Sequence, residues 1–438
     1  MSAVRKRILR TKKKNGEIKR FKDTYKPKAP NGFFRFLADL LSRISIMFHK
    51  LTVRKHGMDG LRPPFLVLGT HHSYVDLKTM CIALAPHKLM YVVSMDVQML
   101  HPVFLLREIG AILKRRHTQD LALLKNMKRA VTNQKNCVLV LYPEGGFTLD
   151  GKTGWYSPAL GKLAKFLGVP VVVGNQHGNT IAQPQWSRRK CELEPRVHKG
   201  VPYTVDLTMV ASSDDIKNLS ADEIQARIEK EMQYDDYAWQ REHNIAIKEK
   251  WRAEGIHKLL YKCPHCGAEF KMTSSGEFLR CNKCSATWEF TELGELRGVN
   301  CESPYPYIPD WFDFQRKAVR EEVESGAYHY DGEVNLCTLP GSRMYRQGTA
   351  RLTHGLDGFT LSGVAYGEPF VRHWNGNEVR ALHIEYNHLL KSDAIAISTA
   401  DDSYWCFMQN DGIITKLRLA NEEIYRLSTS GENVPTVD

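Results

Sequence analysis

Two side chains five positions apart, His71 and Asp76, are the first candidates for chemistry in this sequence. They follow an apolar run over residues 65–68, which is typical of a short buried strand. Residues five apart on a continuous helix point in different directions, so the two side chains meet only if His71 lies in a turn and Asp76 begins the next helix. In that arrangement His71 accepts a proton from a hydroxyl near neutral pH, and Asp76 orients its ring. The alternative is a surface histidine beside an aspartate that caps a helix.

Four cysteines form a second candidate site, in two pairs with the spacing Cys-x2-Cys. The first pair is Cys263 and Cys266, and the second pair, Cys281 and Cys284, follows after fourteen intervening residues. Four thiolates in this pattern are typical of a zinc ribbon, whose closed tetrahedral site leaves no position for water. We expect one structural zinc ion, which would fold a segment too small to hold a core of its own. Redox chemistry of the pairs and contact with nucleic acid are the alternatives.

The elements around the His-Asp pair alternate between strands and helices. Apolar runs typical of buried strands recur between residues 65 and 210, with helical patterns between them. This alternation predicts an α/β domain with a mainly parallel sheet that helices cover on both faces. Polar residues follow several of the strands, and the carboxyl ends of strands are where such sheets place their sites.

The order of four short blocks resembles the glycerophospholipid acyltransferase family, whose best-known members are the lysophosphatidate acyltransferases. The resemblance covers roughly residues 35–235 and rests on the order of the blocks, because each block alone is weak evidence. The blocks are His-x4-Asp at His71 and Asp76, Gly-x5-Arg from Gly110 to Arg116, Tyr-Pro-Glu-Gly at 142–145, and Val-Pro-Val-Val at 169–172.

The resemblance implies transfer of a fatty acyl group from an acyl thioester to the free hydroxyl of a lysophospholipid. The donor would be acyl-CoA or acyl carrier protein, and the expected acceptor is 1-acyl-glycerol-3-phosphate. In the family's scheme His71 is the general base, Asp76 orients it, and the alkoxide attacks the thioester without an acyl-enzyme or a catalytic cofactor. This agrees with a motif that offers a base and its orienting group but no Ser or Cys nucleophile. Arg116 matches the family's phosphate-binding arginine, and Arg115 could assist, since a guanidinium fork fits a phosphate.

The third block carries a departure from the family's pattern. Glu144 and Gly145 match it as expected substrate-binding residues, and a glycine lets the backbone approach a substrate closely. Family members commonly read Glu-Gly-Thr-Arg here, whereas this chain places Phe147 where the second arginine would stand. The expected acceptor is therefore lysophosphatidate held mainly by Arg116, or another lysophospholipid.

The rest of the chain divides into segments with different residue patterns. We expect the acyltransferase domain over residues 32–235, a helical connector over 236–260 and the zinc ribbon over 261–292. Residues 306–430 alternate short β-rich runs with turns and end in a helical pattern. This last pattern resembles pleckstrin-homology and GRAM-like modules, and a plain structural β-domain is the alternative.

The net charge of +12 is concentrated at the N-terminus. Residues 1–28 contain twelve Lys and Arg against two acidic residues, a net charge of +10. We expect residues 1–31 to be a flexible basic arm that meets an acidic partner, unless it is only a solubilising tail. Residues 33–51 then show apolar side chains at helical spacing. A basic arm before an amphipathic Phe-rich helix fits an anionic membrane surface, and a helix packed on the domain core is the alternative.

The composition limits the class of protein. Hydrophobic residues make up 42% and charged residues 25%, as in globular proteins of more than one domain. No run of about eighteen uncharged apolar residues occurs, and no apolar stretch directly follows the basic head. The six other cysteines lack framework spacing, which fits reduced thiols. We expect a cytoplasmic protein, peripheral on the cytoplasmic face of the membrane and without a transmembrane helix.

Two other classes of function remain as alternatives. The first is a nucleic-acid-binding adaptor that uses the basic arm and the ribbon, but basic and acidic residues balance within the ribbon segment. The second is a catalytically silent lipid-binding scaffold. The intact His71 and Asp76 pair favours an enzyme over this scaffold.

Overall fold

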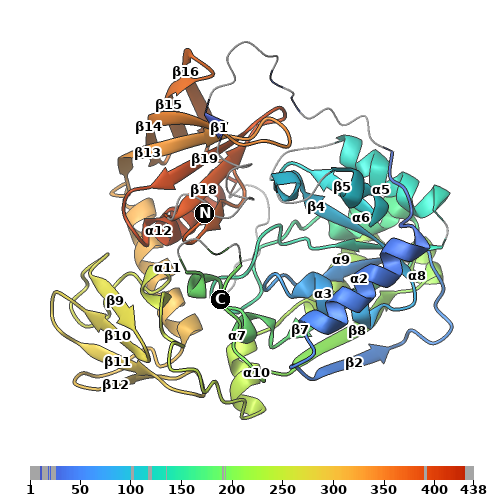
Figure 1. Ribbon diagram of the computed structural model, residues 1–438, viewed down its shortest axis with the longest axis horizontal. Coiled ribbons are helices and arrows are strands. Elements are labelled where there is room, and N and C mark those ends of the chain that lie inside the picture. Colours follow the sequence, from blue (N-terminus) through green and yellow to red (C-terminus); the bar gives the residue numbers. More distant parts are fainter. Residues whose placement is uncertain are drawn as a thin grey trace.

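The computed structural model describes residues 10–11, 18, 20, 26–99, 103–116, 121–134, 136–189, 192, 194–388 and 392–429. These residues form an α/β domain, a four-stranded sheet and a β-rich C-terminal domain (Figure 1). In this view the α/β domain occupies one side of the molecule, and the other two sheets lie together on the opposite side. The predicted fold class, a mainly parallel α/β domain followed by a cysteine-rich segment and a β-rich domain with a terminal helix, is confirmed.

The α/β domain is built on a seven-stranded sheet in the order β2-β8-β7-β3-β6-β4-β5. The five strands from β7 to β5 are parallel, while β8 is antiparallel to β7 and parallel to β2. The strands are β2 Leu51–His56, β3 Phe65–Gly69, β4 Lys88–Ser94, β5 Ala111–Lys114, β6 Cys137–Leu141, β7 Val171–His177 and β8 Tyr203–Ala211.

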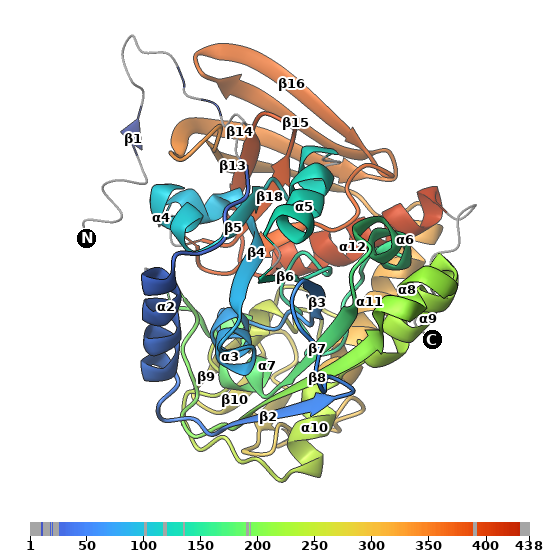
Figure 2. The same cartoon turned by 90° about the vertical axis from the view of Figure 1, so that its right-hand side faces the viewer.

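Both faces of this sheet are covered, as continuous apolar strands require. Alternate residues of a strand face opposite sides, and in β3 Leu66 packs with α5, α6 and α9 while Val67 packs with α3. Figure 2 shows α2 along the outside of the domain beside α3. The helices are α2 Gly32–Ser45, α3 Asp76–Ala83, α4 Val103–Glu108, α5 Leu121–Asn133, α6 Leu160–Leu167, α7 Asn179–Ala182, α8 Ser213–Asn218, α9 Ala221–Glu231 and α10 Asp236–Glu242.

The helical connector expected over residues 236–260 is wrong for most of its length. After α10 the chain is irregular, apart from a short 3-10 helix, Ile256–Lys258. Asn244 has a φ of +50°, which ends the helical path, and the backbone N–H of Ile247 donates to the carbonyl oxygen of Glu292 in the next domain. This segment therefore bonds to the ribbon instead of continuing as a helix.

The ribbon and the C-terminal domain share one apolar core. Leu279 and Trp288 of the ribbon belong to the same buried cluster as Trp311 of α11, and the two indole rings pack edge to face at 5.0 Å. The ribbon sheet is antiparallel in the order β12-β11-β10-β9. Its strands are β9 Met272–Ser275, β10 Phe278–Cys281, β11 Thr287–Phe290 and β12 Leu296–Gly298.

The C-terminal domain is an antiparallel sheet in the order β16-β15-β14-β13-β19-β18-β17. Helix α11 precedes the sheet and packs against the closing helix α12. The elements are α11 Ile308–Glu324, β13 Tyr330–Thr338, β14 Tyr345–Gly355, β15 Gly358–Ala365, β16 Glu368–Asn375, β17 His383–Glu385, β18 Ala394–Ser398, β19 Ser403–Met408 and α12 Ile413–Ser428.

Two described parts of the expected basic arm contact the C-terminal domain, whereas Lys28 forms an ion pair of 2.9 Å with Glu108 of α4 in the α/β domain. Strand β1, Arg10–Thr11, pairs with β14, and Arg20 forms an ion pair of 2.8 Å with Asp401. Most of the arm predicted over residues 1–31 lies outside the described residues. Among the helices that the structure describes, none has the length and apolar composition to cross a membrane.

Candidate active site

His71 and Asp76 meet at the carboxyl end of β3, as their spacing predicted. His71 lies in the turn after the strand, and Asp76 is the first residue of α3. The distance between Nδ1 of His71 and Oδ2 of Asp76 is 2.9 Å. Since a carboxylate accepts this bond, Nδ1 carries the proton and Nε2 of the neutral ring is left as a proton acceptor.

Several donors fix the Asp76 carboxylate, which is fully buried. Its Oδ2 also accepts from the backbone N–H groups of His72 at 2.6 Å and Ser73 at 3.0 Å. Its Oδ1 accepts from Nδ2 of Asn179 at 2.8 Å. The sequence reasoning missed Asn179, although a polar residue just after the neighbouring strand β7 was the signal available.

The surroundings of His71 favour the neutral imidazole that a general base requires. Burial lowers the pKa of His71, the hydrogen bond to Asp76 opposes this, and the positive charge of Arg116 lowers the pKa further. The ring stacks on Tyr142 at 4.5 Å and lies 4.4 Å from the ring of Phe147. A base with a lowered pKa is unprotonated over a wider pH range.

The adjacent His72 is engaged in a separate buried network. Its Nδ1 lies 2.9 Å from Oγ1 of Thr180, and its Nε2 lies 3.0 Å from Oγ1 of Thr70. Burial disfavours the charged ring, but nearby carboxylates, above all Asp236 at 3.4 Å, raise the pKa of His72 overall. Both ring nitrogens of His72 therefore contact protein groups, which separates its environment from that of His71.

Glu144 lies in the turn after β6 and binds the loop that carries His71. Its Oε1 accepts from the backbone N–H of His71 at 3.0 Å, and its Oε2 accepts from Gly154 N at 3.0 Å and Tyr234 Oη at 3.2 Å. Burial raises the pKa of Glu144 to about 7. Its carboxylate oxygens thus contact protein donors, and these contacts position the His71 loop. Gly145 follows with a φ of +69°, a conformation that favours glycine.

The two arginines after β5 have different environments. Nε of Arg116 donates to Asp96 at 2.8 Å, and Nη1 approaches the carbonyl oxygen of Gly145 at 3.4 Å. Arg116 therefore lies beside the turn after β6 and near His71, where a phosphate ligand was expected.

The expectation that Arg115 assists in binding phosphate is corrected by its contacts. The side chain is buried, and its guanidinium binds the C-terminal domain instead of the region around His71. Both arginines follow the end of β5, and their guanidinium groups bind different partners, the C-terminal domain for Arg115 and Asp96 for Arg116. The acceptors of Arg115 are the carbonyl oxygens of Leu339, Pro340, Ala400 and Asp401 and Oγ of Ser403, at 2.8–3.1 Å.

A buried polar cluster, formed by Tyr74, Arg188 and Glu385, joins the His71 loop to the C-terminal domain. Arg188 forms an ion pair of 2.6 Å with Glu385, and it also donates to the Tyr74 hydroxyl at 2.8 Å. Both charged side chains are almost completely buried. Sequence reasoning missed this cluster, because nothing local links the two segments.

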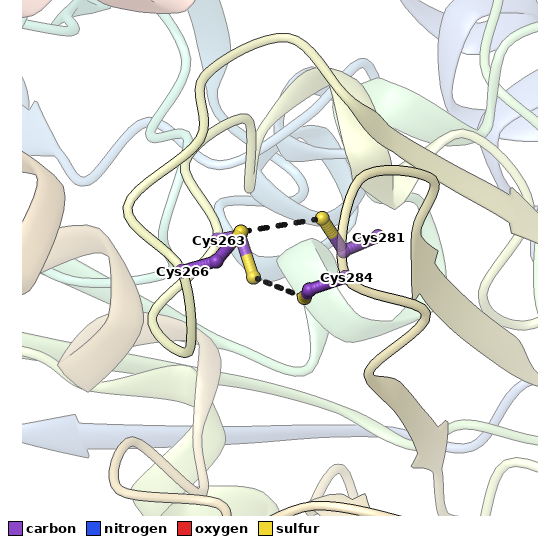
Figure 3. Close-up of side chains that lie close together, drawn as sticks. All are labelled: Cys263, Cys266, Cys281 and Cys284. Atoms are coloured by element: carbon purple, nitrogen blue, oxygen red, sulfur yellow. Dashed lines mark hydrogen bonds between the residues drawn. The ribbon is translucent and has the colours of Figure 1, made fainter.

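The four cysteines of the ribbon converge from two turns, as Figure 3 shows. All four sulfur atoms lie within 4.8 Å of one another. The distance between the sulfur atoms is 3.8 Å for Cys263 and Cys284 and 3.8 Å for Cys266 and Cys281. Thiolates about 2.3 Å from a tetrahedral zinc ion lie about 3.8 Å apart, so the residues present fit this metal.

Comparisons with known proteins bear on the α/β domain. A sequence model of the family described as Acyltransferase matches residues 52–173. No curated protein matches the chain in sequence. A solved structure, the 1-acyl-sn-glycerophosphate acyltransferase PlsC from Thermotoga maritima, is 14% identical, with a TM-score of 0.37, and the match covers 45% of this chain and 76% of that one. The segment that matches the family contains His71, Asp76, Arg116 and the block at 142–145.

Proposed function

We propose that the protein transfers a fatty acyl group from an acyl thioester to a lysophospholipid hydroxyl, since residues 52–173 match the acyltransferase family. The proposed acceptor is 1-acyl-glycerol-3-phosphate, and the proposed donor is acyl-CoA or acyl carrier protein. The observation that carries the proposal is the 2.9 Å contact between His71 Nδ1 and the buried Asp76 carboxylate. This contact leaves Nε2 to act as a base.

The reaction follows from this geometry in balanced steps. Nε2 of His71 removes the proton from the acceptor hydroxyl, and the oxygen attacks the carbonyl carbon of the thioester. The ester C–O bond forms and the C–S bond breaks, and the departing thiolate takes the proton from the imidazolium. Asp76 stabilises the imidazolium through the charge-assisted bond at Nδ1. No protein nucleophile takes part.

Arg116 is proposed to bind the acceptor phosphate. Its positive charge lies close enough to His71 to lower the pKa of that ring. The ion pair with Asp96 holds one edge of the guanidinium and so orients it. A phosphate bound at Arg116 would bring the acceptor hydroxyl toward His71.

Helix α2 is proposed to bind the cytoplasmic face of an anionic membrane. Its Ser42 is buried and the helix packs against α3, so the expected packing on the domain is present. The other face is apolar and open to solvent, which supports the membrane alternative as well. The exposed apolar side chains of α2 and the turn after it are Phe33, Phe36, Leu40, Leu41, Ile44, Met47 and Phe48.

The ribbon is proposed to hold one structural zinc ion. The ligands would be Cys263, Cys266, Cys281 and Cys284, and the ion would supply no chemistry to the acyl transfer. Its role would be to hold the ribbon strands, which pack into the core of the C-terminal domain.

The test of the proposed function is acyl transfer by the purified full chain from labelled acyl-CoA, and from labelled acyl carrier protein, to a set of lysophospholipids. Esterified product supports the proposal, and the preferred acceptor identifies the head group. A folded, zinc-containing sample that forms no product with any pair would refute it and favour a lipid-binding scaffold.

A further inference from the structure

A pocket lies between the α/β domain and the C-terminal domain, beside the His-Asp pair. Glu144 and Phe147, in the segment after β6, line one wall, while His383 of β17 and Arg418 of α12 line the other. The ring of Phe147 lies 4.4 Å from the ring of His71. The pocket therefore shares a wall with the surroundings of the proposed base.

Arg418 brings a positive charge from the C-terminal domain to this wall. Its Nη1 donates to the carbonyl oxygen of Phe147 at 3.2 Å, and its Nε donates to Glu422 at 3.1 Å. The side chain is 16% exposed, so the charge is largely shielded from solvent. The ion pair with Glu422 compensates part of this charge and orients the guanidinium, whose N–H groups form charge-assisted hydrogen bonds with an anion.

His383 carries a buried polar atom that suits a ligand. Its side chain is 5% exposed. Nε2 has no hydrogen-bond partner among the described residues, although it lies 3.4 Å from Oε1 of Glu385. Buried polar atoms are rarely left unpaired, so a group that accepts from this nitrogen would complete its hydrogen bonding. Arg116 lies close enough for its charge, together with burial, to lower the pKa of His383.

Buried contacts fix the C-terminal wall against the α/β domain. Glu385, two residues after His383, pairs with Arg188, and Arg115 binds the turn that joins β18 to β19. Removing one partner of a buried ion pair is strongly destabilising, so these contacts keep the wall in a fixed position relative to His71.

We propose that Arg418 and His383 in this pocket bind the phosphate head group of the lysophospholipid acceptor together with Arg116, whose Nη1 lies 3.4 Å from the carbonyl oxygen of Gly145 beside the pocket wall. The inference rests on the proposed acyl transfer and gives the C-terminal domain a part in substrate recognition. Glu144 also lines the pocket, but its two oxygens accept bonds from His71, Gly154 and Tyr234.

The test compares Arg418→Gln and His383→Asn in the full chain by titration calorimetry. The probes are a short-chain lysophosphatidate and the matching monoacylglycerol, which lacks the phosphate. We expect each variant to raise the Kd for lysophosphatidate about tenfold or more and to leave monoacylglycerol binding unchanged, with Arg418→Lys in between. Arg426→Gln is the matched control, because Arg426 lies on the same helix and pairs with Glu423 and Glu324.

The outcomes separate this inference from the proposed function. Unchanged lysophosphatidate binding in both variants, or no binding by the native chain, would overturn the pocket assignment even if acyl transfer occurs. Loss of binding in either folded variant would support the assignment even if no acyl transfer is found. An equal loss for both probes would also contradict it, because a head-group site discriminates by the phosphate.

Discussion

Replacing Asp76 by Asn removes the negative charge behind the His71 ring and keeps the shape of the side chain. The amide oxygen of Asn can still accept from Nδ1 of His71 and from the backbone N–H groups of His72 and Ser73. The NH2 group of the new asparagine would then face Asn179. Among the described residues, Oδ1 of Asn179 is buried without a hydrogen-bond partner. A flip of the Asn179 amide turns this oxygen into the acceptor and gives up only the long contacts of its Nδ2 with Gln176 at 3.4 Å and Thr79 at 3.5 Å. The substitution therefore conserves the short hydrogen bonds of the site.

The expected loss of rate follows from the bond at Nδ1. In the native site a carboxylate at 2.9 Å stabilises the imidazolium that forms as the proton is taken. Bonds to charged groups contribute about 1.5–3 kcal/mol, which corresponds to a fall in kcat of about 10- to 200-fold. The negative charge of Asp76 raises the pKa of His71, so its loss also moves the acid limb of the pH–rate profile to lower pH.

The assay is steady-state acyl transfer between pH 5 and pH 9 by the native chain, by Asp76→Asn and by His71→Ala. We expect an intermediate rate for Asp76→Asn and an acid limb displaced to lower pH. A rate equal to that of the native chain would refute the electrostatic role of Asp76. A shift of the limb to higher pH would refute the assignment of that limb to His71.

Three further predictions address other parts of the molecule. Cys263→Ser should reduce the zinc content from one per chain toward zero by elemental analysis, and full retention would refute the four-cysteine site. The double variant Phe36→Ser, Phe48→Ser should sediment less with anionic vesicles, because both phenylalanine side chains are exposed apolar groups. The control variant Val371→Ser, which changes an exposed apolar residue of β16, should sediment with the vesicles as the native chain does. Because burial raises the pKa of Glu144 from 4.5 to about 7, folding favours its protonated form. Native stability should therefore fall relative to Glu144→Gln as the pH rises from about 4.5 to 7, by at most about 3 kcal/mol. Thermal unfolding at several pH values measures this difference, and parallel curves would contradict it.

Local patterns were sufficient to predict much of the fold. The spacing of His71 and Asp76 allows the two side chains to meet only across a turn followed by a helix start, and the structure has both. Ser220 and Glu223, three residues apart, likewise form a capping box at the start of α9. These features depend on backbone geometry within a few residues, which is the range over which sequence patterns are informative.

Long-range contacts account for what the sequence could not show. Arg115 and Arg116 are the same residue type side by side, and only the C-terminal domain next to Arg115 distinguishes their roles. The pairing of Arg188 with Glu385 has no local signal. Residues after α10 lack frequent Gly or Pro and so suggested a helix, but bonding to the ribbon overrides this tendency.

His71 is proposed to be the base for acyl transfer to a lysophospholipid. The most direct measurement is formation of labelled phospholipid from an acyl thioester and lysophosphatidate by the native chain and by His71→Ala, with folding and zinc content checked in both. If His71 is the base, the native chain forms product and the variant forms none. Equal product from both proteins would contradict it.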